Sequence, residues 1–405
     1  MPSATSVLPF VPVAVAPPPA PATSARFTLD GDTSLETHLA HVCDLVRAGV
    51  DRLVPPGRLE GVLLGGGYGR GEGGVLHAPE GDQPYNDLEF YVLLRGSTVV
   101  NEWRYRRALD ELGHALSAAA GIEVEFKIIS RAGLRRSPVT MFYYDLVSGH
   151  RRVAGPTDLL EGCGHHRRGE HIPLAEAARL LMNRCTGLLF ARDRLDRPDF
   201  GDEDADFVAR NMAKAGLALG DAVLVAHGQY HWSCRERARR LAALDAQEGG
   251  LVCLDAVRSV HAEGVQFKLL PHRTERTARE LERDFVRISQ LACRVWLWLE
   301  SRRLGVPFHS PVDYALHPAE KCPGMPRARN WVVNARRVGG WDLIGRRGFR
   351  YPRERLLRAL PVLLWQPDMA VNPRVRHRLQ RELRTTATGR PGLIAAYVRL
   401  WEIFR

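Results

Sequence analysis

Two carboxylates stand close together in a segment that otherwise has the pattern of a buried β-strand, "PYNDLEFYVLL" at residues 84–94. Side chains alternate between the two faces of a strand, so Asp87 and Glu89 point the same way and lie roughly 7 Å apart. At an effective dielectric constant of about 20, two such charges repel each other by roughly 2 kcal/mol. A bound cation would reverse the sign of this interaction. A strand with one face in water is the alternative, and it needs no cation.

A glycine-rich turn precedes this strand. The segment "LEGVLL" at 59–64 predicts a short apolar strand, and it runs directly into "GGGYGRGEGG" at 65–74. Glycine lets the backbone approach a ligand closely and leaves N–H groups available to an anion.

The glycines from Gly69 to Gly74 also match the GxGxxG motif of dinucleotide-binding folds, with Glu89 20 residues after Gly69. The residues that follow, "VLHAPEGDQP", contain two prolines and no helical period. That motif requires a helix at this point, so the dinucleotide-binding fold is excluded. A protein-kinase loop is excluded because neither HRD nor DFG occurs in the chain.

Further acids follow in "IEVEFKII" at 122–129, which alternates as another strand. In this order of strand, glycine turn, paired acids and later acidic strand, the sequence resembles the nucleotidyltransferase superfamily that includes DNA polymerase beta. It is most similar in pattern to the kanamycin and aminoglycoside nucleotidyltransferase branch. The resemblance covers about residues 35–155. It implies transfer of NMP from an NTP, with ATP expected first, to an unknown acceptor with release of pyrophosphate.

The resemblance also implies a metal site. In-line attack on an α-phosphate uses two divalent ions, and hard Mg²⁺ prefers carboxylate oxygens, with Mn²⁺ as a possible substitute. Asp87 and Glu89 would hold the ions, and one acid of the later strand would complete the catalytic group. Glu123 and Glu125 point to one face of that strand, so spacing does not choose between them. We favour Glu125, because "VEFKII" continues the strand beyond it, and keep Glu123 as the competitor.

The glycine turn would hold the nucleotide. Gly66 and Gly67 would let the backbone approach the triphosphate. Residue 67 is glycine where many members of the family carry serine, so one hydroxyl contact is missing. Arg70 is either a phosphate ligand or a surface arginine, and we expect Glu72 to pair with Arg70 or to cap the turn.

A second group of polar residues lies on one predicted helix at 204–228. At 100° per residue, Asn211, Lys214 and Asp221 fall within about 80° of one another. The chain has only four lysines, and a compact ammonium suits contact with a β- or γ-phosphate. Asp221 could orient Lys214, contact the substrate or act as general base. A buried structural pair of Lys214 and Asp221 is equally expected.

The pattern of elements predicts an α+β protein. We expect a disordered Pro/Ala-rich leader at 1–28, a nucleotidyltransferase domain with a small mixed sheet at 29–170, a larger all-helical nucleotide- and substrate-binding domain at 171–310, and a basic helical region at 311–405.

Four local expectations concern the first domain. Thr33 and Glu36 would form a capping box, and Asn101 would cap a helix that ends at Ala120. Residues 75–85 would form a polar loop, and "TMFYYDLVS" at 140–148 would form a strand.

Charge is distributed unevenly along the chain. The net charge is +11, but residues 321–405 contain 19 basic and 5 acidic residues, against 38 and 41 in the rest. This asymmetry favours an anionic partner for the C-terminal region, such as RNA, although a solvated arginine-rich surface is the commoner explanation. The acceptor of the reaction could accordingly be a small molecule, a protein or an RNA end.

Composition indicates a cytoplasmic protein without a membrane partner. No segment approaches the roughly 20 apolar residues of a membrane helix. The seven cysteines are scattered and never spaced as CxxC, which favours reduced thiols.

A second functional class is a catalytically inactive protein with a nucleotidyltransferase-like fold that senses nucleotide or binds RNA. The acids at 87, 89 and 123 or 125 argue against it, because clustered carboxylates repel a triphosphate unless metal is present.

Overall fold

The computed structural model describes residues 26–245, 250–337 and 348–404. The expected leader therefore falls mostly on residues outside the described part of the chain. Its predicted end at residue 28 is too late, because Phe27 is buried and Thr28 forms a β-bridge with Gly73.

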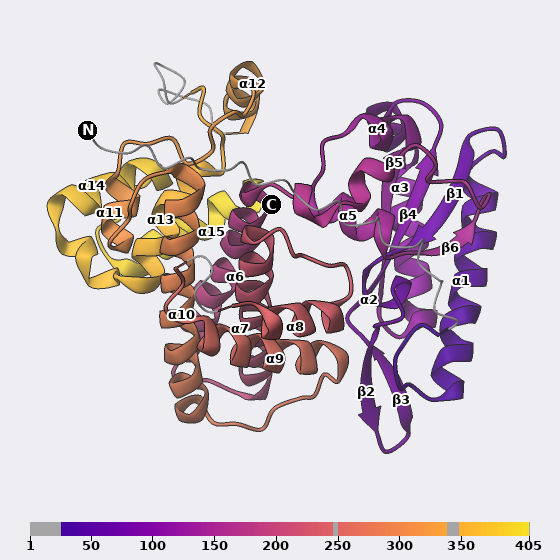
Figure 1. Ribbon diagram of the computed structural model, residues 1–405, viewed down its shortest axis with the longest axis horizontal. Coiled ribbons are helices and arrows are strands. Elements are labelled where there is room, and N and C mark those ends of the chain that lie inside the picture. Colours follow the sequence, from indigo (N-terminus) through magenta and orange to yellow (C-terminus); the bar gives the residue numbers. More distant parts are fainter. Residues whose placement is uncertain (1–25, 246–249, 338–347, 405) are drawn as a thin grey trace, which may run out of the picture.

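The first part of the chain is a small mixed sheet with helices on both faces (Figure 1). Its elements are α1 (Thr33–Leu53), β1 (Leu59–Leu64), α2 (Gly66–Gly69), β2 (Gly74–Ala78), β3 (Gly81–Tyr85), β4 (Asp87–Leu94), α3 (Thr98–Ala120), β5 (Glu123–Ser130), α4 (Arg131–Arg136), α5 (Met141–Ser148) and β6 (Arg151–Ala154). The main sheet has the order β5-β4-β1-β6, with β4 and β5 parallel and the other pairs antiparallel. Strands β2 and β3 form a separate antiparallel hairpin. The expected α+β class is confirmed at this level.

Successive side chains of β4 point to opposite faces of the sheet and belong to two separate hydrophobic cores. Leu88, Phe90 and Val92 are buried in one cluster with residues of α1 and α3. Tyr91 and Leu93 point to the opposite face and pack with residues of α4 and α5. Asp87 and Glu89 share this second face at the start of the strand, where they line a cavity instead of joining the core.

Two of the local expectations in this domain are wrong about secondary structure. Residues 141–148 form helix α5, because the Thr140 hydroxyl caps it by accepting the Tyr143 N–H at 3.1 Å. Residues 75–85 form most of the β2–β3 hairpin instead of a loop.

The two expected caps are also wrong. The Asp32 carboxylate caps α1, since it accepts the Leu35 N–H at 2.7 Å. Glu36 accepts the backbone N–H groups of Phe27 and Thr28 and so fixes the chain ahead of the helix. Asn101 lies inside α3, which begins at Thr98, and its amide donates to the Arg95 carbonyl at 3.1 Å.

The rest of the described chain is helical. It comprises η1 (Gly164–Arg167), η2 (Gly169–His171), α6 (Leu174–Leu195), α7 (Asp202–Ala226), α8 (Cys234–Ala243), α9 (Leu254–Leu269), α10 (Ala278–Leu304), α11 (Pro311–Leu316), α12 (Arg327–Arg337), α13 (Glu354–Trp365), η4 (Pro367–Val371), α14 (Pro373–Leu383) and α15 (Arg390–Phe404). Within the described residues, no helix is both long and apolar enough to cross a membrane.

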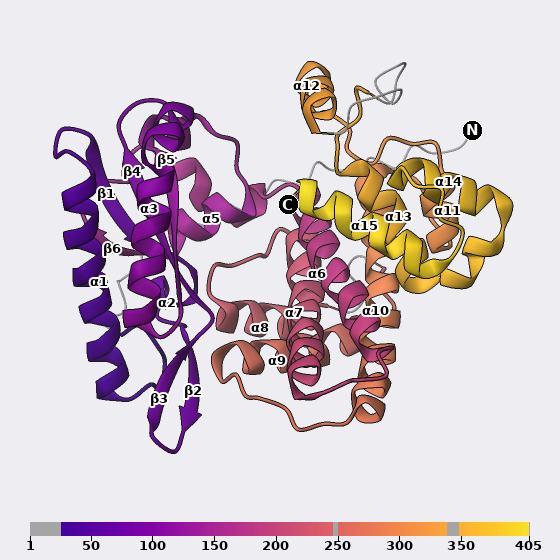
Figure 2. The same ribbon diagram turned by 180° about the vertical axis from the view of Figure 1, so that it is seen from behind.

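One hydrophobic core runs through this helical part. It joins residues of α6, α7 and α10 to residues of α13, α14 and α15. Figure 2 shows the C-terminal helices lying against α6 and α10. Helices α6, α7 and α10 therefore form one packed unit with α13, α14 and α15, although the sequence suggested two regions.

Candidate active site

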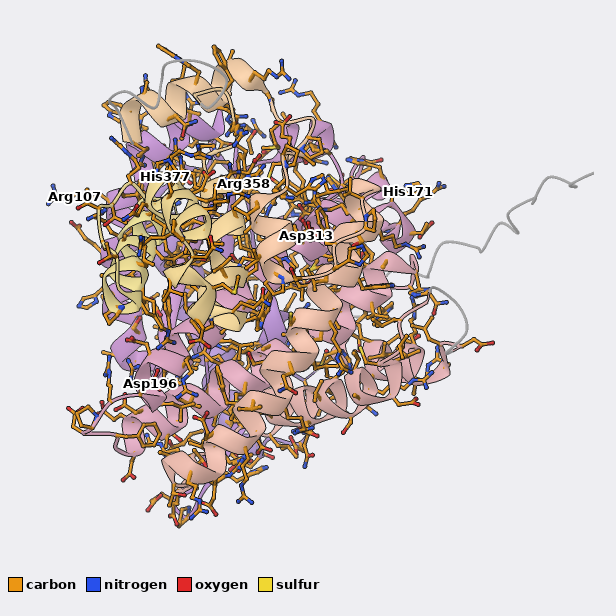
Figure 3. All side chains as sticks on the ribbon, turned by 90° about the vertical axis from the view of Figure 1, so that its left-hand side faces the viewer. Arg107, His171, Asp196, Asp313, Arg358 and His377 are labelled. Atoms are coloured by element: carbon orange, nitrogen blue, oxygen red, sulfur yellow. The ribbon has the colours of Figure 1, made fainter. Side chains whose placement is uncertain are left out.

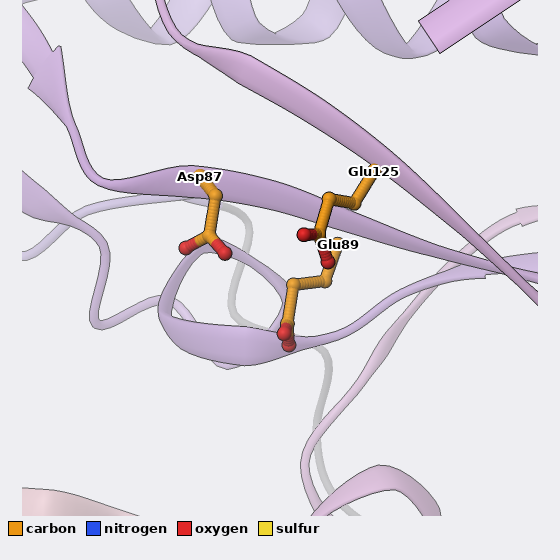
Figure 4. A group of neighbouring side chains, drawn as sticks. All are labelled: Asp87, Glu89 and Glu125. Atoms are coloured by element: carbon orange, nitrogen blue, oxygen red, sulfur yellow. The ribbon is translucent and has the colours of Figure 1, made fainter. Parts of the chain in front are cut away.

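Three carboxylates converge where β4 and β5 begin (Figure 4). The parallel register sets Asp87 beside Glu123 and Glu89 beside Glu125. One carboxylate oxygen from each of Asp87, Glu89 and Glu125 lies within 4.8 Å of the other two. Glu123 is outside this group, although it lines the same groove between β5 and α3 as Glu125. Between the two alternatives, the geometry thus favours Glu125 over Glu123.

A lysine partly neutralises the acids. Lys127 follows Glu125 by two residues on the same face of β5, and its Nζ lies 2.7 Å from Glu89 Oε1 and 3.3 Å from Glu125 Oε2. The Tyr91 hydroxyl donates to Glu89 Oε2 at 3.0 Å. Although burial opposes ionisation, these partners lower the pKa of Glu89. Burial, and then the charge of Glu89, raise the pKa of Asp87, which forms no ion pair within the described residues.

The carboxylates suit a hard divalent cation. Oxygen donors of this kind bind Mg²⁺ and Mn²⁺. The Lys127 ammonium already contacts two of the three, which indicates that the group is stabilised by positive charge. Burial and the charge of Glu89 raise the pKa of Asp87, so a cation bound beside it would stabilise its ionised form.

The glycine turn lies directly beside these acids. The Gly65 N–H donates to the Glu89 carbonyl at 2.9 Å, and the Gly69 N–H donates to the Gly65 carbonyl at 3.0 Å. The N–H groups of Gly66 and Gly67 are therefore at the open start of a helical turn. Gly66 has φ +62, and a Cβ there would lie 3.4 Å from Glu89 Oε2.

The local backbone accounts for glycine at residue 67. A Cβ at Gly67 would lie only 2.9 Å from the Glu72 carbonyl oxygen. Any larger residue would force the turn open, so glycine at this position is a requirement of the local backbone.

A cavity of about 400 Å³ separates the sheet and the glycine turn from the helical part. Asp87 and Glu89 line one wall, together with Gly66 and Gly67. The opposite wall carries three cations. They are Arg184 of α6, Lys214 of α7 and Lys268 of α9.

These cations have no counter-charge in contact with them. Among the described residues, none of the three side chains forms a hydrogen bond or ion pair with another residue. Burial, and then Arg70, lower the pKa of Lys268 to about 8. Burial, and then Arg184, lower the pKa of Lys214. The wall thus presents positive charge that would be stabilised by an anion.

Part of the cavity lining is aromatic or aliphatic. Tyr85 and Phe267 meet edge to face with ring centroids 6.4 Å apart, and Ala213 and Leu217 belong to the same lining. Asn86, which lies between Tyr85 and Asp87, has the left-handed conformation with φ 76. This uncommon backbone conformation turns the chain just before the first carboxylate.

Arg70 and Glu72 have different partners from those expected. Arg70 lines the cavity, but its Nη1 lies 3.1 Å from Asp145 Oδ2 and donates to the Trp232 carbonyl. Glu72 accepts the Ser233 hydroxyl at 2.5 Å and the Cys234 N–H at 2.9 Å, so it caps α8. The predicted pair of Glu72 with Arg70 is wrong, and Glu72 instead connects the glycine turn to the helical part.

Asp221 is also placed differently from the prediction. It is buried, with Oδ1 3.1 Å from Arg237 Nε and 3.2 Å from His261 Nε2, and it is not part of the cavity lining. Lys214 therefore faces the cavity without it, and the predicted pair of Lys214 with Asp221 is wrong. Despite complete burial, Arg237 and His261 lower the pKa of Asp221.

Lys268 and Arg184 were not predicted from the sequence. Lys268 is one of only four lysines in an arginine-rich chain, and this rarity was the signal that could have found it. Arg184 carried no such signal, because it is one of many arginines at a helical position. Only the packing of α6 and α9 beside α7 brings both residues to the cavity.

Comparison with protein-family models finds no model that matches this sequence, and comparison with curated proteins finds no match either.

Proposed function

We propose that the protein is a metal-dependent nucleotidyltransferase that transfers NMP from an NTP, ATP first among them, to an acceptor and releases pyrophosphate. One observation carries this proposal. Asp87 and Glu89, which cluster with Glu125, face three cations without a contacting counter-charge across a cavity of about 400 Å³, and the glycine turn lines the same cavity.

Each wall suits one component of a metal–nucleotide complex. Asp87, Glu89 and Glu125 would hold Mg²⁺, which supplies neutralisation of phosphate charge and orients the attacking oxygen. Lys214, Lys268 and Arg184 would bind the phosphate oxygens that point to the helical part. The N–H groups of Gly66 and Gly67 would donate to the same phosphates from the sheet side.

The aromatic part of the cavity lining suits the nucleoside. Tyr85 and Phe267 offer aromatic surface on which a base would pack. The acceptor would approach the carboxylates that hold the metal.

A protein that only binds nucleotide would not need this acidic group. Asp87 and Glu89 line the same cavity as the cations, so without metal they would repel a triphosphate. The raised pKa of Asp87 means that its ionised form is unfavourable in the folded protein. Such a perturbed pKa is expected at catalytic sites.

The proposal is tested by measuring pyrophosphate release with each NTP and a metabolite extract, with and without Mg²⁺. The wild-type protein should release pyrophosphate only with metal. The matched variants are Glu125→Gln and Glu123→Gln, because both remove one carboxylate from the same strand face. We expect Glu125→Gln to abolish release and Glu123→Gln to retain it.

Measurement of nucleotide binding distinguishes a transferase from a catalytically inactive protein that senses nucleotide. Metal-dependent binding that Asp87→Asn abolishes supports the transferase. Nucleotide binding that is independent of metal and unaffected by Asp87→Asn, without pyrophosphate release, contradicts it.

A further inference from the structure

The C-terminal region carries positive charge that its own acids leave largely uncompensated. Residues 321–405 contain 19 basic and 5 acidic residues. Two of those acids are buried in local ion pairs: Glu354 lies 2.7 Å from Arg358, and Glu382 lies 2.9 Å from Arg378. Arg358 is labelled among the C-terminal helices in Figure 3. These acids stabilise the interior and do not neutralise the surface.

Helix α12, "RARNWVVNARR", gathers this charge in one place. It has no acidic residue, and its arginines Arg327, Arg329, Arg336 and Arg337 are all exposed. In the described part of the chain, none of the four forms an ion pair or a side-chain hydrogen bond. Figures 1 and 2 show α12 projecting from the packed helices, and nitrogen-tipped side chains extend from it at the top of Figure 3.

Two asparagines hold α12 in a defined orientation. The Asn330 amide donates to the Phe349 carbonyl at 3.2 Å. The Asn334 amide donates to the carbonyls of Gly348 and Arg350, both at 2.9 Å. Both asparagines are buried, so they mark the inner face of the helix. Trp331 and Val332 remain on the outside, with 39% and 41% of their surface exposed.

We infer that α12 is a binding surface for single-stranded RNA. Arginines that lack a counter-charge bind phosphates and release counterions, which favours association with a polyanion. An exposed tryptophan among them provides a platform on which an unpaired base stacks. Unpaired RNA loops and ends present such bases, whereas a duplex hides the base faces.

The composition of α12 disfavours the other polyanionic surface, a bilayer of acidic lipids. A helix that lies in a membrane interface needs a continuous apolar face. On α12 the exposed apolar side chains are Ala328, Trp331 and Val332, of which only the last two are large, and arginines flank them at both ends of the helix.

RNA binding by α12 does not depend on the catalytic proposal. The further idea that the bound RNA also supplies the acceptor hydroxyl rests on the proposed transferase activity. Binding and transfer are therefore measured separately, so that failure of one is not mistaken for failure of the other.

The test is fluorescence anisotropy with a fluorescein-labelled oligouridylate and the full chain, between about 50 and 200 mM salt. One variant changes Arg327, Arg329, Arg336 and Arg337 to Gln. The matched control changes four exposed arginines of the first domain, Arg58, Arg95, Arg104 and Arg107, to Gln and so removes the same charge. A third variant, Trp331→Ala, leaves the charge unchanged. Circular dichroism confirms that each variant is folded.

For the α12 variant, the slope of log affinity against log salt should become shallower by about 2 to 3, because each phosphate that the helix no longer neutralises reduces the slope by about 0.7. Trp331→Ala should weaken binding about tenfold at every salt concentration. The control should bind like the wild-type protein. Equal reductions of affinity in the α12 variant and the control would overturn the proposal. Tighter binding to duplex RNA, single-stranded DNA or phosphatidylglycerol vesicles than to the oligouridylate would overturn the choice of partner.

Discussion

Two groups of charged residues lie close to the boundary between the sheet and the helical part, and they differ in how their charges are paired. In the first, Asp221 contacts Arg237 and His261, and Arg70 contacts Asp145. In the second, the cavity keeps Asp87 and the cations Arg184, Lys214 and Lys268 without an ion pair among the described residues. Asp221, Arg237 and His261 are buried. Asp87, Arg184 and Lys268 are partly exposed and Lys214 is exposed, so the two groups differ in exposure as well as in pairing.

The difference concerns what each group stabilises. A buried charge whose partner is supplied by the chain contributes to the fold, and removal of one partner is costly. A charge whose partner must come from outside destabilises the free protein and is stabilised by ligand. Measurements of stability and activity on the same variants separate the two groups.

The largest expected effect is on catalysis. Asp87→Asn should reduce NMP transfer by about 10³-fold or more, since metal contributes several kcal/mol to stabilisation of the transition state. The same variant should be at least as stable as the wild-type protein, because the pKa of Asp87 is raised in the fold and its charge is unfavourable there. Radiolabelled NMP transfer and urea denaturation measure the two quantities. A marked loss of stability would place Asp87 in the paired group instead.

The opposite outcome is expected for Asp221→Asn. The change leaves Arg237 buried without its carboxylate, so the free energy of unfolding should fall by about 3 kcal/mol. Urea denaturation measures it, with Glu123→Gln, an exposed glutamate outside the cluster, as the control that changes stability by less than about 0.5 kcal/mol. Unchanged stability in Asp221→Asn would remove the distinction between the two groups.

Much of the difference between the paired and the unpaired charges could not be predicted from the sequence. The strand pattern correctly placed Asp87 and Glu89 on one face, and the glycine turn beside them, because both features are local. Spacing alone left Glu123 and Glu125 on one strand face, and the positions of the carboxylate oxygens support the preference for Glu125. Helical periodicity predicted that Lys214 and Asp221 lie on one face of α7. Only tertiary packing places Asp221 against Arg237 and Lys214 at the cavity.

The secondary-structure errors have the same origin. Residues 140–148 have the composition of a strand, yet the Thr140 cap and the need to cover the sheet make them helix α5. Arg184 and Lys268 come from helices far apart in sequence, so no local spacing could group them with Lys214.

A smaller effect is expected when one wall cation is removed. Lys214→Met or Lys268→Met should weaken nucleotide binding about tenfold or more, because a hydrogen bond to a charged group contributes about 1.5–3 kcal/mol. Stability should be unchanged or higher, since burial disfavours both ammonium groups in the free protein. Isothermal titration with a non-hydrolysable ATP analogue and Mg²⁺ measures the affinity. Equal affinity in all three proteins would exclude these lysines from the nucleotide site.

The pH dependence of nucleotide binding tests whether Lys268 contacts the phosphates. Its pKa is lowered to about 8 in the free protein, and a bound phosphate would raise it. Above pH 8 binding must therefore take up a proton, so affinity should fall by up to about tenfold per pH unit. Lys268→Met should lose this dependence. If the variant keeps the wild-type pH profile, the titrating group is another residue.

Metal binding tests the central claim most directly. Titration of Mn²⁺, followed by electron paramagnetic resonance in the presence of a non-hydrolysable ATP analogue, reports on the three carboxylates without requiring the acceptor. The wild-type protein and Asp221→Asn, at a temperature where both are folded, should bind Mn²⁺, and Asp87→Asn should not. Mn²⁺ binding by Asp87→Asn with the wild-type affinity would contradict the account.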